Sequence, residues 1–227
     1  VPHYMIDVVD INDSFSVEEY RTQALPIIND ILLRNKTPII CGGTGQYIDA
    51  LIYENTFPQV KPNTKLRETL ERKTPEELFK QLESLDIRRA KEIDKHNKVR
   101  LIRAIEIATS LGHVPKQEDL VPRFDITMYL LNPSKELLEK RVHARLLKRF
   151  DIGMLYEMNN LIAQGYNGEV IAKRGIEYKH MNEYLKGNYT YDELIEKLRI
   201  ATWQYAKRQR TWNKKYEKIA TIVDVKE

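Results

Sequence analysis

Residues 37–51 constrain the fold of this chain more than any other segment. The apolar residues 39–41 predict a short buried strand, and Gly42 and Gly43 let the backbone turn tightly and approach a ligand closely. Thr44 is in position to cap the helix expected through residues 47–51. This order favours an anion-binding or nucleotide-binding corner of an α/β sheet. An ordinary strand-to-helix turn would use the same residues, so the segment by itself leaves both interpretations open.

A helix is expected directly before this strand. Residues 16–19 read Ser-Val-Glu-Glu, which is a capping box, and they predict a helix that begins at Ser16. The apolar positions that follow with helical spacing are Val17, Tyr20, Ala24, Ile27, Ile28 and Ile31. Asn35 and Lys36 end the helix, and a helix followed by a strand is typical of a parallel sheet.

The sequence changes character between residues 57 and 122. Pro58 and Pro62 interrupt the chain, and residues 74–77, Thr-Pro-Glu-Glu, predict the start of a helix. We therefore expect an all-helical insertion at 57–122, between a first part of an α/β core at 1–56 and a second part at 123–227. The second part should contain strands at 124–131 and 221–225, a helix that opens at 132–134, and a basic C-terminal helix.

Residues 202–212 combine three cations with three aromatic rings on a long helical pattern. A helix repeats every 3.6 residues, so Gln204, Lys207, Arg208 and Thr211 share one face. Positive charges beside hydrogen-bonding side chains suit the binding of phosphates. The alternative is a solvated amphipathic helix whose rings lie in the core.

A second basic pattern precedes it. Arg141, Arg145 and Arg149 are spaced by four residues and should line one helix face, either as a solvated stripe or as a contact to phosphates or an RNA backbone. His3 has no Cys, His or carboxylate at ligand spacing, so we predict no protein-built metal site there.

Five segments, in order along the chain, resemble the tRNA dimethylallyltransferase (isopentenyl-diphosphate:tRNA transferase) family. Residues 1–7 resemble its PHHLID segment, 42–47 its GGTxLY, 97–106 its [DN]xxRxxRA[LI]E, 174–179 its Rx[IV]GY[KR], and 202–212 its TRx[YL]AKRQxTW. Each match is weak by itself, but five in family order are specific. The chain departs from the family pattern at Gln46, Glu177, Trp203, Asn213 and Lys214, where the family usually has Leu, Gly, Arg, an aromatic residue and Arg.

The largest departure concerns the family's opening segments. The P-loop, GxTxxGK[ST], and the DSxQxY segment with the proposed general-base Asp do not occur in this sequence. We expect the chain to be part of a longer gene product rather than a protein that has lost its diphosphate cradle. Alone, it should not transfer a dimethylallyl group at a useful rate. Without the strand that leads into the P-loop, apolar faces around Ile39, Ile40 and Met128 should be exposed.

The resemblance implies a P-loop-kinase-like parallel sheet core, with its N-terminal part missing, and an all-helical insertion that contacts tRNA. It implies transfer of a dimethylallyl group from dimethylallyl diphosphate to the N6 amine of the adenosine 3′ of the anticodon, with Mg²⁺ as cofactor and no metal-ligating residue in this chain. The expected partners are the tRNA anticodon stem-loop and dimethylallyl diphosphate, for a cytoplasmic monomer that does not contact a membrane.

The same resemblance, together with the basic patterns above, gives the candidate site residues. The catalytic candidates are Thr44 and Arg174. The substrate-binding candidates are Gly42, Gly43, Tyr47, Lys179, Gln204, Lys207 and Arg208. The RNA-binding candidates are Arg100, Arg103, Arg141, Arg145, Gln209 and Arg210.

Composition excludes some classes of protein and leaves others open. A hydrophobic content of 42% and a charged content of 31% are typical of a globular chain, and no apolar run is long enough to span a membrane. The lone Cys41 excludes an internal disulfide and a cysteine metal cage. A net charge of +4 permits nucleic-acid binding without requiring it.

Two other functions remain open at this point. One is an adenylate isopentenyltransferase, which would act on free AMP or ATP. The other is a non-catalytic RNA-binding module. The helical insertion and the basic residues 202–212 favour the tRNA enzyme, because a large substrate requires a large binding surface.

Overall fold

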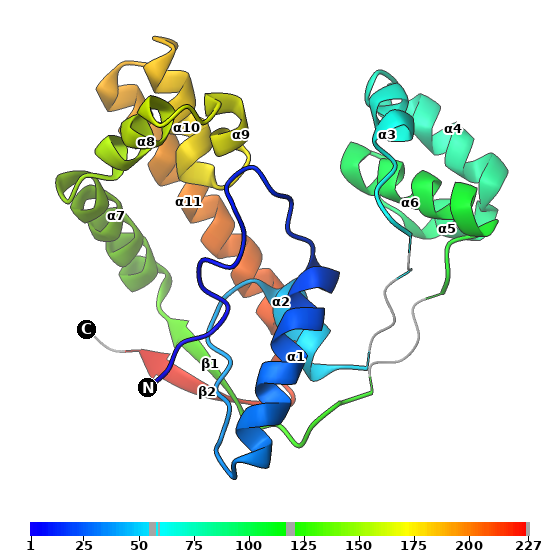
Figure 1. Ribbon diagram of the computed structural model, residues 1–227, viewed down its shortest axis with the longest axis horizontal. Helices are drawn as coiled ribbons and strands as arrows, with labels where there is room; N and C mark the ends of the chain where they lie inside the picture. Colours follow the sequence, from blue (N-terminus) through cyan, green and yellow to red (C-terminus); the bar gives the residue numbers. More distant parts are fainter. Residues whose placement is uncertain (55–57, 59, 117–120, 226–227) are drawn as a thin grey trace. The chain divides into compact units, whose positions relative to one another are not determined.

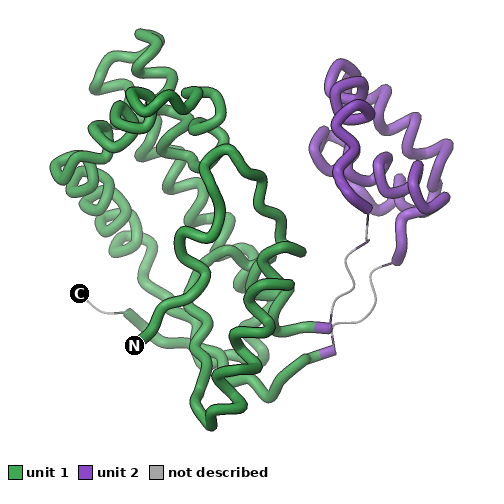
Figure 2. Tube along the Cα trace, in the orientation of Figure 1, with its two compact units in different colours: residues 1–53, 122–227 green, residues 54–121 purple. Residues whose placement is uncertain are grey.

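The computed structural model describes residues 1–54, 58, 60–116 and 121–225. These residues form two compact units (Figure 2). Unit 1 consists of Val1–Tyr53 and Pro122–Glu227, and unit 2 is Glu54–Val121. The units therefore change at 53/54 and 121/122, where the sequence predicted boundaries at 56/57 and 122/123.

Unit 1 begins with an extended segment and two helices that pack together. Helix α1 (Val17–Leu33) starts with the predicted capping box at Ser16, and α2 (Gly45–Ile52) follows the glycine-rich turn. The buried contact between the two helices is made by Ala24, Ile28 and Leu51. Burial of these apolar side chains fixes α2 against α1.

The sheet of unit 1 has two parallel strands in the described part of the chain. Strand β1 (Met128–Pro133) pairs with β2 (Ala220–Val225), in a register that sets Met128 opposite Ala220. The sequence predicted both strands, although β1 begins four residues later than expected because residues 124–127 are not paired. The result is a mainly helical unit with a small parallel sheet.

The strand predicted at residues 39–41 was wrong. These residues are not part of a β-ladder in the described structure, and the Ile39 and Ile40 side chains are 81% and 40% exposed. A strand is stabilised by backbone hydrogen bonds to a neighbour, and apolar residues alone do not supply that neighbour. The expected exposure around Ile39 and Ile40 is confirmed, whereas Met128 is half-buried and packs against the cluster of Ile52, Tyr53 and Tyr216.

The described part of unit 1 contains five further helices. They are α7 (Lys135–Asp151), α8 (Met154–Ala163), α9 (Gly168–Ala172), α10 (Ile176–Leu185) and α11 (Tyr191–Asn213), followed by the 3-10 turn η1 (Lys214–Tyr216). Figure 1 shows α11 running from the α8–α10 group to α2 and the sheet. Leu194 and Leu198 of α11 lie in the core shared with α8 and α10, and Tyr216 lies in the core below α2.

Unit 2 is a four-helix assembly in its described residues. It contains α3 (Thr64–Glu71), α4 (Pro75–Leu85), α5 (Ile87–Glu92) and α6 (Lys98–Leu111) around their own apolar core. The predicted helix start at Thr74 is confirmed by a complete capping box. One buried carboxylate, Glu106 of α6, accepts hydrogen bonds from the Asn63 backbone and the Arg67 side chain at the start of α3.

Candidate functional site

The glycine corner, defined here as residues 42–45, leads into α2. Thr44 is at the N-cap position, as predicted, but within the described residues its side chain makes no capping hydrogen bond. The Ser and Thr residues that do cap helices here, Ser16, Thr74, Ser134 and Thr190, have ψ between 159° and 167°, whereas Thr44 has ψ of 91°. The Thr44 hydroxyl thus belongs to an exposed residue and has no helix-capping partner, which leaves it available to a ligand.

The close packing of α11 explains why two positions of the corner are glycines. A Cβ atom at Gly43 would collide with the end of the Gln209 side chain, and one at Gly45 would collide with the Trp212 ring. Gln209 Nε2 donates a hydrogen bond to the Gly43 carbonyl at 3.0 Å. The absence of a Cβ atom at Gly43 and Gly45 therefore allows the close approach of α11. The predicted close approach of a ligand to Gly42 and Gly43 stays a prediction.

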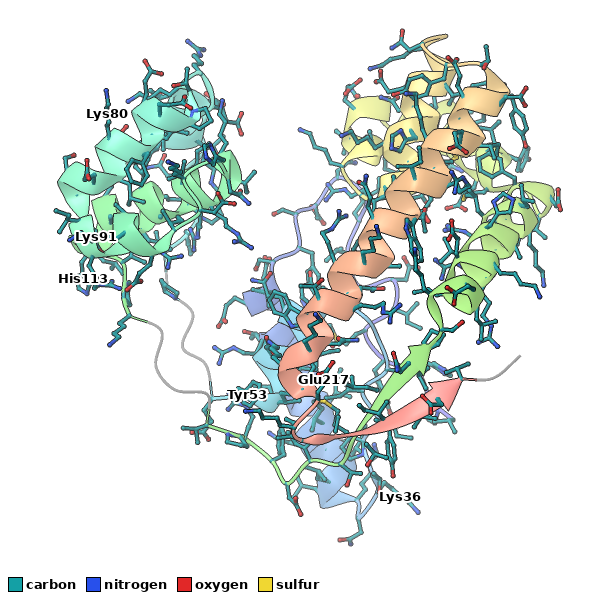
Figure 3. The ribbon with its side chains drawn as sticks, turned by 180° about the vertical axis from the view of Figure 1, so that it is seen from behind. Lys36, Tyr53, Lys80, Lys91, His113 and Glu217 are labelled. Atoms are coloured by element: carbon teal, nitrogen blue, oxygen red, sulfur yellow. The ribbon has the colours of Figure 1, made fainter. Side chains whose placement is uncertain are left out.

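A third contact lies one turn further along α2, where Asp49 meets the residues that follow α11. Asp49 is buried, forms an ion pair with Lys215 and accepts a hydrogen bond from the Tyr216 hydroxyl. The Lys215 ammonium also lies 4.3 Å from the centroid of the Trp212 ring. We call Gln209, Trp212 and Tyr216 the clamp, because they contact positions 43, 45 and 49 in turn. In Figure 3, Tyr53 at the end of α2 and Glu217 beyond η1 mark the end of unit 1 where these contacts lie.

Tyr47 lies in the first turn of α2 and stacks on another aromatic ring. Its ring centroid is 4.5 Å from that of Tyr20 on α1, with 17° between the planes. Burial, and then the charge of Glu19, raise the pKa of the Tyr47 phenol. The phenol is therefore protonated at neutral pH and can only donate or accept a hydrogen bond, not act as an anion.

The basic face of α11 is exposed, as predicted. Gln204, Lys207, Arg208 and Thr211 all lie on the solvent side, opposite the buried stripe of Leu194, Leu198, Thr202 and Ala206. The alternative, in which the rings lie in the core, was wrong, because Trp203 is only half-buried and Tyr205 and Trp212 are exposed. Trp203 and Tyr205 instead lie beneath cations, with Lys207 Nζ and Arg208 Cζ each 5.6 Å from a ring centroid. Arg210 is also exposed.

Arg174 and Lys179 lie elsewhere in unit 1. Arg174 is exposed in the turn between α9 and α10, and Lys179 is exposed on α10. Helix α10 packs on the first half of α11 through Met181. The glycine corner contacts the opposite end of α11, so the structure does not bring Arg174 and Lys179 into contact with the corner.

The three arginines of α7 do not behave alike. Arg141 and Arg145 are exposed, whereas Arg149 is half-buried and forms an ion pair with Glu177 of α10. Glu177 stands where the resembling family usually has Gly. The charge of Arg149 is therefore paired with a carboxylate on α10, which fits neither a solvated stripe nor a phosphate contact at this position.

Arg100 and Arg103, both on α6 of unit 2, differ in the same way. Arg100 is exposed. Arg103 contacts the carboxylate of Glu106 and donates to the Val60 carbonyl at 3.0 Å. Glu106 is 2% exposed and also receives two hydrogen bonds from Arg67. Burial alone would raise the pKa of Glu106, but the hydrogen bonds from Arg67, Asn63 and Arg103 outweigh it and lower the pKa.

The structure therefore sorts the candidate residues into three groups. The first, at the glycine corner and the second half of α11, contains Gly42, Gly43, Thr44, Tyr47, Gln204, Lys207, Arg208, Gln209 and Arg210. The second, on α7 and α9–α10, contains Arg141, Arg145, Arg174 and Lys179. The third, in unit 2, contains Arg100 and Arg103.

Sequence reasoning missed Asp49, Lys215 and Tyr216. Their signal was present in the spacing, since Gly45 and Asp49 are four residues apart on α2, and Gln209, Trp212 and Tyr216 follow with spacings of three and four. Spacing shows that residues share a face but not which helix faces them, so the pairing required the structure.

Two further findings concern metals and membranes. Within residues 1–54, 58, 60–116 and 121–225, no group of three or more His, Cys, Asp or Glu side chains converges in a way that could hold a metal ion. Mg²⁺ stays a prediction. Among the described helices, none has the length and apolar character needed to cross a bilayer.

The chain is similar to known proteins along most of its length. The model of the IPP transferase family matches residues 1–216. The tRNA dimethylallyltransferase of Pelotomaculum thermopropionicum is 32% identical over 226 residues, which cover 96% of this chain and 72% of that protein. The crystal structure of the tRNA isopentenylpyrophosphate transferase of Bacillus halodurans is 30% identical and superposes with a TM-score of 0.68, covering 99% of this chain and 72% of that one.

A more distant structure shares the fold. A eukaryotic dimethylallyltransferase, described as acting on tRNA, superposes with a TM-score of 0.76 at 22% identity and covers 99% of this chain and 60% of that one. The match of the family model over nearly the whole chain and the identity to the curated relative lead to one conclusion: this chain belongs to the IPP transferase family.

Proposed function

We propose that this protein is a tRNA dimethylallyltransferase, which transfers a dimethylallyl group from dimethylallyl diphosphate to the N6 amine of the adenosine 3′ of the anticodon. The observation that carries the proposal is the first group of residues: in a member of the IPP transferase family, α11 presents Lys207 and Arg208 to solvent while the adjacent Gln209 holds the glycine corner. A face of exposed cations on α11 thus adjoins the glycine corner that leads into α2.

The reaction makes three physical demands on the site. The diphosphate must leave with its negative charge stabilised, the adenosine amine must be aimed at the allylic carbon, and the target base must be turned out of the stacked anticodon loop. The C–O bond of the allylic diphosphate breaks, the N6–C bond forms, and the amine loses one proton.

We assign these demands to the residues as follows. Gly42, Gly43 and Thr44 hold the extruded adenosine, with the uncapped Thr44 hydroxyl as the group that hydrogen-bonds to it. Lys207 and Arg208 bind phosphates of the RNA or the diphosphate. Arg174 and Lys179 form a separate basic site on α9–α10 that binds RNA or diphosphate phosphates, and Arg100 of unit 2 contacts the RNA backbone. Mg²⁺ stays the proposed cofactor, and none of these assignments depends on it.

The competing functions are less well supported. An adenylate isopentenyltransferase would act on a small nucleotide and would not require the exposed cations of α11 and unit 2. The curated relative and the Bacillus halodurans structure both bear names of enzymes that act on tRNA. A module that only binds RNA would require the chemistry to be absent altogether.

The test is a transfer assay with the protein expressed from its complete gene. Incubation with dimethylallyl diphosphate, Mg²⁺ and unmodified tRNA should add the mass of one dimethylallyl group to the RNA. Matched controls are a tRNA with guanosine at the target position and free AMP, neither of which should be modified. Modification of AMP in preference to tRNA would support the adenylate enzyme, and binding of tRNA without any product would support the RNA-binding module.

A further inference from the structure

We propose that Gln209 is a positioning residue that orients the glycine corner and, through it, the Thr44 hydroxyl. The inference rests on the proposed function and names a specific role for a side chain that the sequence had indicated only as an RNA contact. Gln209 does not touch the substrate in this proposal; it acts through the Gly43 carbonyl.

The hydrogen bond fixes a peptide plane. Gln209 Nε2 donates to the Gly43 carbonyl oxygen at 3.0 Å, and the carbonyl belongs to the peptide group that joins Gly43 to Thr44. Because that group is planar and ends at the Thr44 Cα atom, orienting its C=O also orients the Thr44 N–H and fixes the position of the Cα atom that carries the Thr44 side chain. The Thr44 hydroxyl lacks a capping bond of its own among the described residues, so its position depends on the backbone.

The neighbouring contacts hold Gln209 in place. It is half-buried on the α11 face that continues with Trp212, whose ring fills the space beside Gly45. One turn further along α2, Asp49 is bound by Lys215 and Tyr216. The body of α2 is therefore attached to α11 and η1 without Gln209, and loss of this one amide should loosen the corner while the helix stays docked.

Two roles for Gln209 make different predictions. As an RNA contact, its loss would weaken tRNA binding and leave the rate of the bound complex unchanged. As a positioning residue, its loss would leave tRNA affinity unchanged and lower kcat, because the adenosine amine would be misaligned in the bound complex.

The experiment replaces Gln209 by Met in the protein from the complete gene. Met has a similar length but no N–H donor. We expect kcat to fall by about tenfold to a hundredfold, as for a small misplacement of a reacting group. The Kd for tRNA and the melting temperature should stay close to those of the unaltered protein. Gln23→Met, on the exposed face of α1, makes the same chemical change away from the corner and should leave all three quantities unchanged.

A double-mutant cycle sharpens the test. If Gln209 acts through Thr44, then Thr44→Ala should reduce kcat much less in the Gln209→Met background than in the unaltered protein. If the two substitutions instead reduced kcat independently, so that the fold-reductions of the single variants multiplied in the double variant, the proposal would be overturned. An unchanged kcat in Gln209→Met, or a raised tRNA Kd with unchanged kcat, would also overturn it.

A structural readout does not depend on turnover. In the 227-residue chain, Gln209→Met should shift the ¹⁵N–¹H resonance of the Thr44 amide, whereas Gln23→Met should not; an unmoved Thr44 resonance overturns the proposal. If Gln209→Met does not fold, Gln209→Glu replaces it, since an ionised carboxylate of the same length cannot donate to the carbonyl. Absence of product from the unaltered protein would reject the proposed function, while the amide shift would still decide the role of Gln209.

Discussion

Thr44 occupies the N-cap position of α2, but its side chain makes no capping hydrogen bond. A role in binding substrate can therefore be separated experimentally from a role in stabilising the helix. We predict that Thr44→Ala lowers turnover in the protein from the complete gene, with a barrier increase of roughly 2.7–4 kcal/mol if a positioned hydrogen bond in the transition state is lost. The free energy of unfolding should change little, since no capping hydrogen bond is broken. Single-turnover rates and urea unfolding of the same samples give both numbers.

Thr74 is the matched control for this prediction. It caps α4 through a complete capping box in unit 2, so Thr74→Ala should cost about 0.5–2 kcal/mol of unfolding free energy and leave turnover unchanged. If Thr44→Ala instead lowered stability by a similar amount and turnover stayed normal, Thr44 would be a structural residue only.

Single positions show how far the sequence predicts the site. The N-cap position of Thr44 follows from the residue type, but the missing capping hydrogen bond and the contact of the corner with Gln209 of α11 are visible only in the structure. Arg103 and Arg149 belong to patterns that indicate RNA contacts, yet each is paired with a glutamate. A motif does not reveal which of its cations is neutralised, because the partner comes from the fold.

At the scale of elements, a hydrogen bond at the protein surface couples α8 and α10. The Tyr178 hydroxyl of α10 donates to the Glu157 carboxylate of α8. Burial is the main reason why the pKa of Tyr178 is raised to about 12, and this hydrogen bond is the second. Below pH 10 the folded and unfolded chains both keep the phenol proton. As the pH rises from 10 to 12, the unfolded chain releases it first, so deprotonation favours unfolding and stability falls.

We therefore predict that Tyr178→Phe changes the pH dependence of stability. Near pH 8 the variant should be less stable by about 0.5–1.5 kcal/mol, because it lacks the hydrogen bond. Between pH 10 and 12 the difference from the unaltered protein should shrink, since Phe has no proton to lose. Tyr156→Phe, on the exposed side of α8, should show neither effect, and a difference that stays constant across the pH range in urea unfolding would contradict the prediction.

Helices were predicted better than strands, for a physical reason. The capping boxes at Ser16 and Thr74 satisfy helix ends from within the sequence, so α1 and α4 begin where expected. Residues 39–41 are of strand-forming types, but a strand also needs a second strand to which its backbone can hydrogen-bond. The sequence does not show which segment of the chain, if any, lies beside residues 39–41. The exposed face of α11 was predicted because helical periodicity is local.

At the scale of the whole molecule, the exposed Ile39 and Ile40 form an apolar surface on an unpaired extended segment. Such segments can pair with a second chain. We predict that the 227-residue chain self-associates as its concentration rises, and that Ile39→Lys reduces this without lowering the melting temperature. Sedimentation velocity measures the first quantity and thermal unfolding the second.

Ile152 provides the comparison, since it is 75% exposed but lies at the end of α7, away from any extended segment. Ile152→Lys should leave self-association unchanged. Equal effects of the two substitutions would attribute self-association to general surface hydrophobicity, and a monomeric unaltered chain at all concentrations would refute the prediction.

The two places where the chain leaves and re-enters unit 1 are next to each other. Tyr53 and Pro122 form an antiparallel bridge, and the Arg123 N–H donates to the Ile52 carbonyl at 2.8 Å. Bridged residues lie only about 5 Å apart, a gap that a two-residue turn can close. An ancestral gene could therefore have gained the whole helical insertion in a single event, with no change to the packing of unit 1, and related genes could lengthen, shorten or exchange it independently of the chemistry.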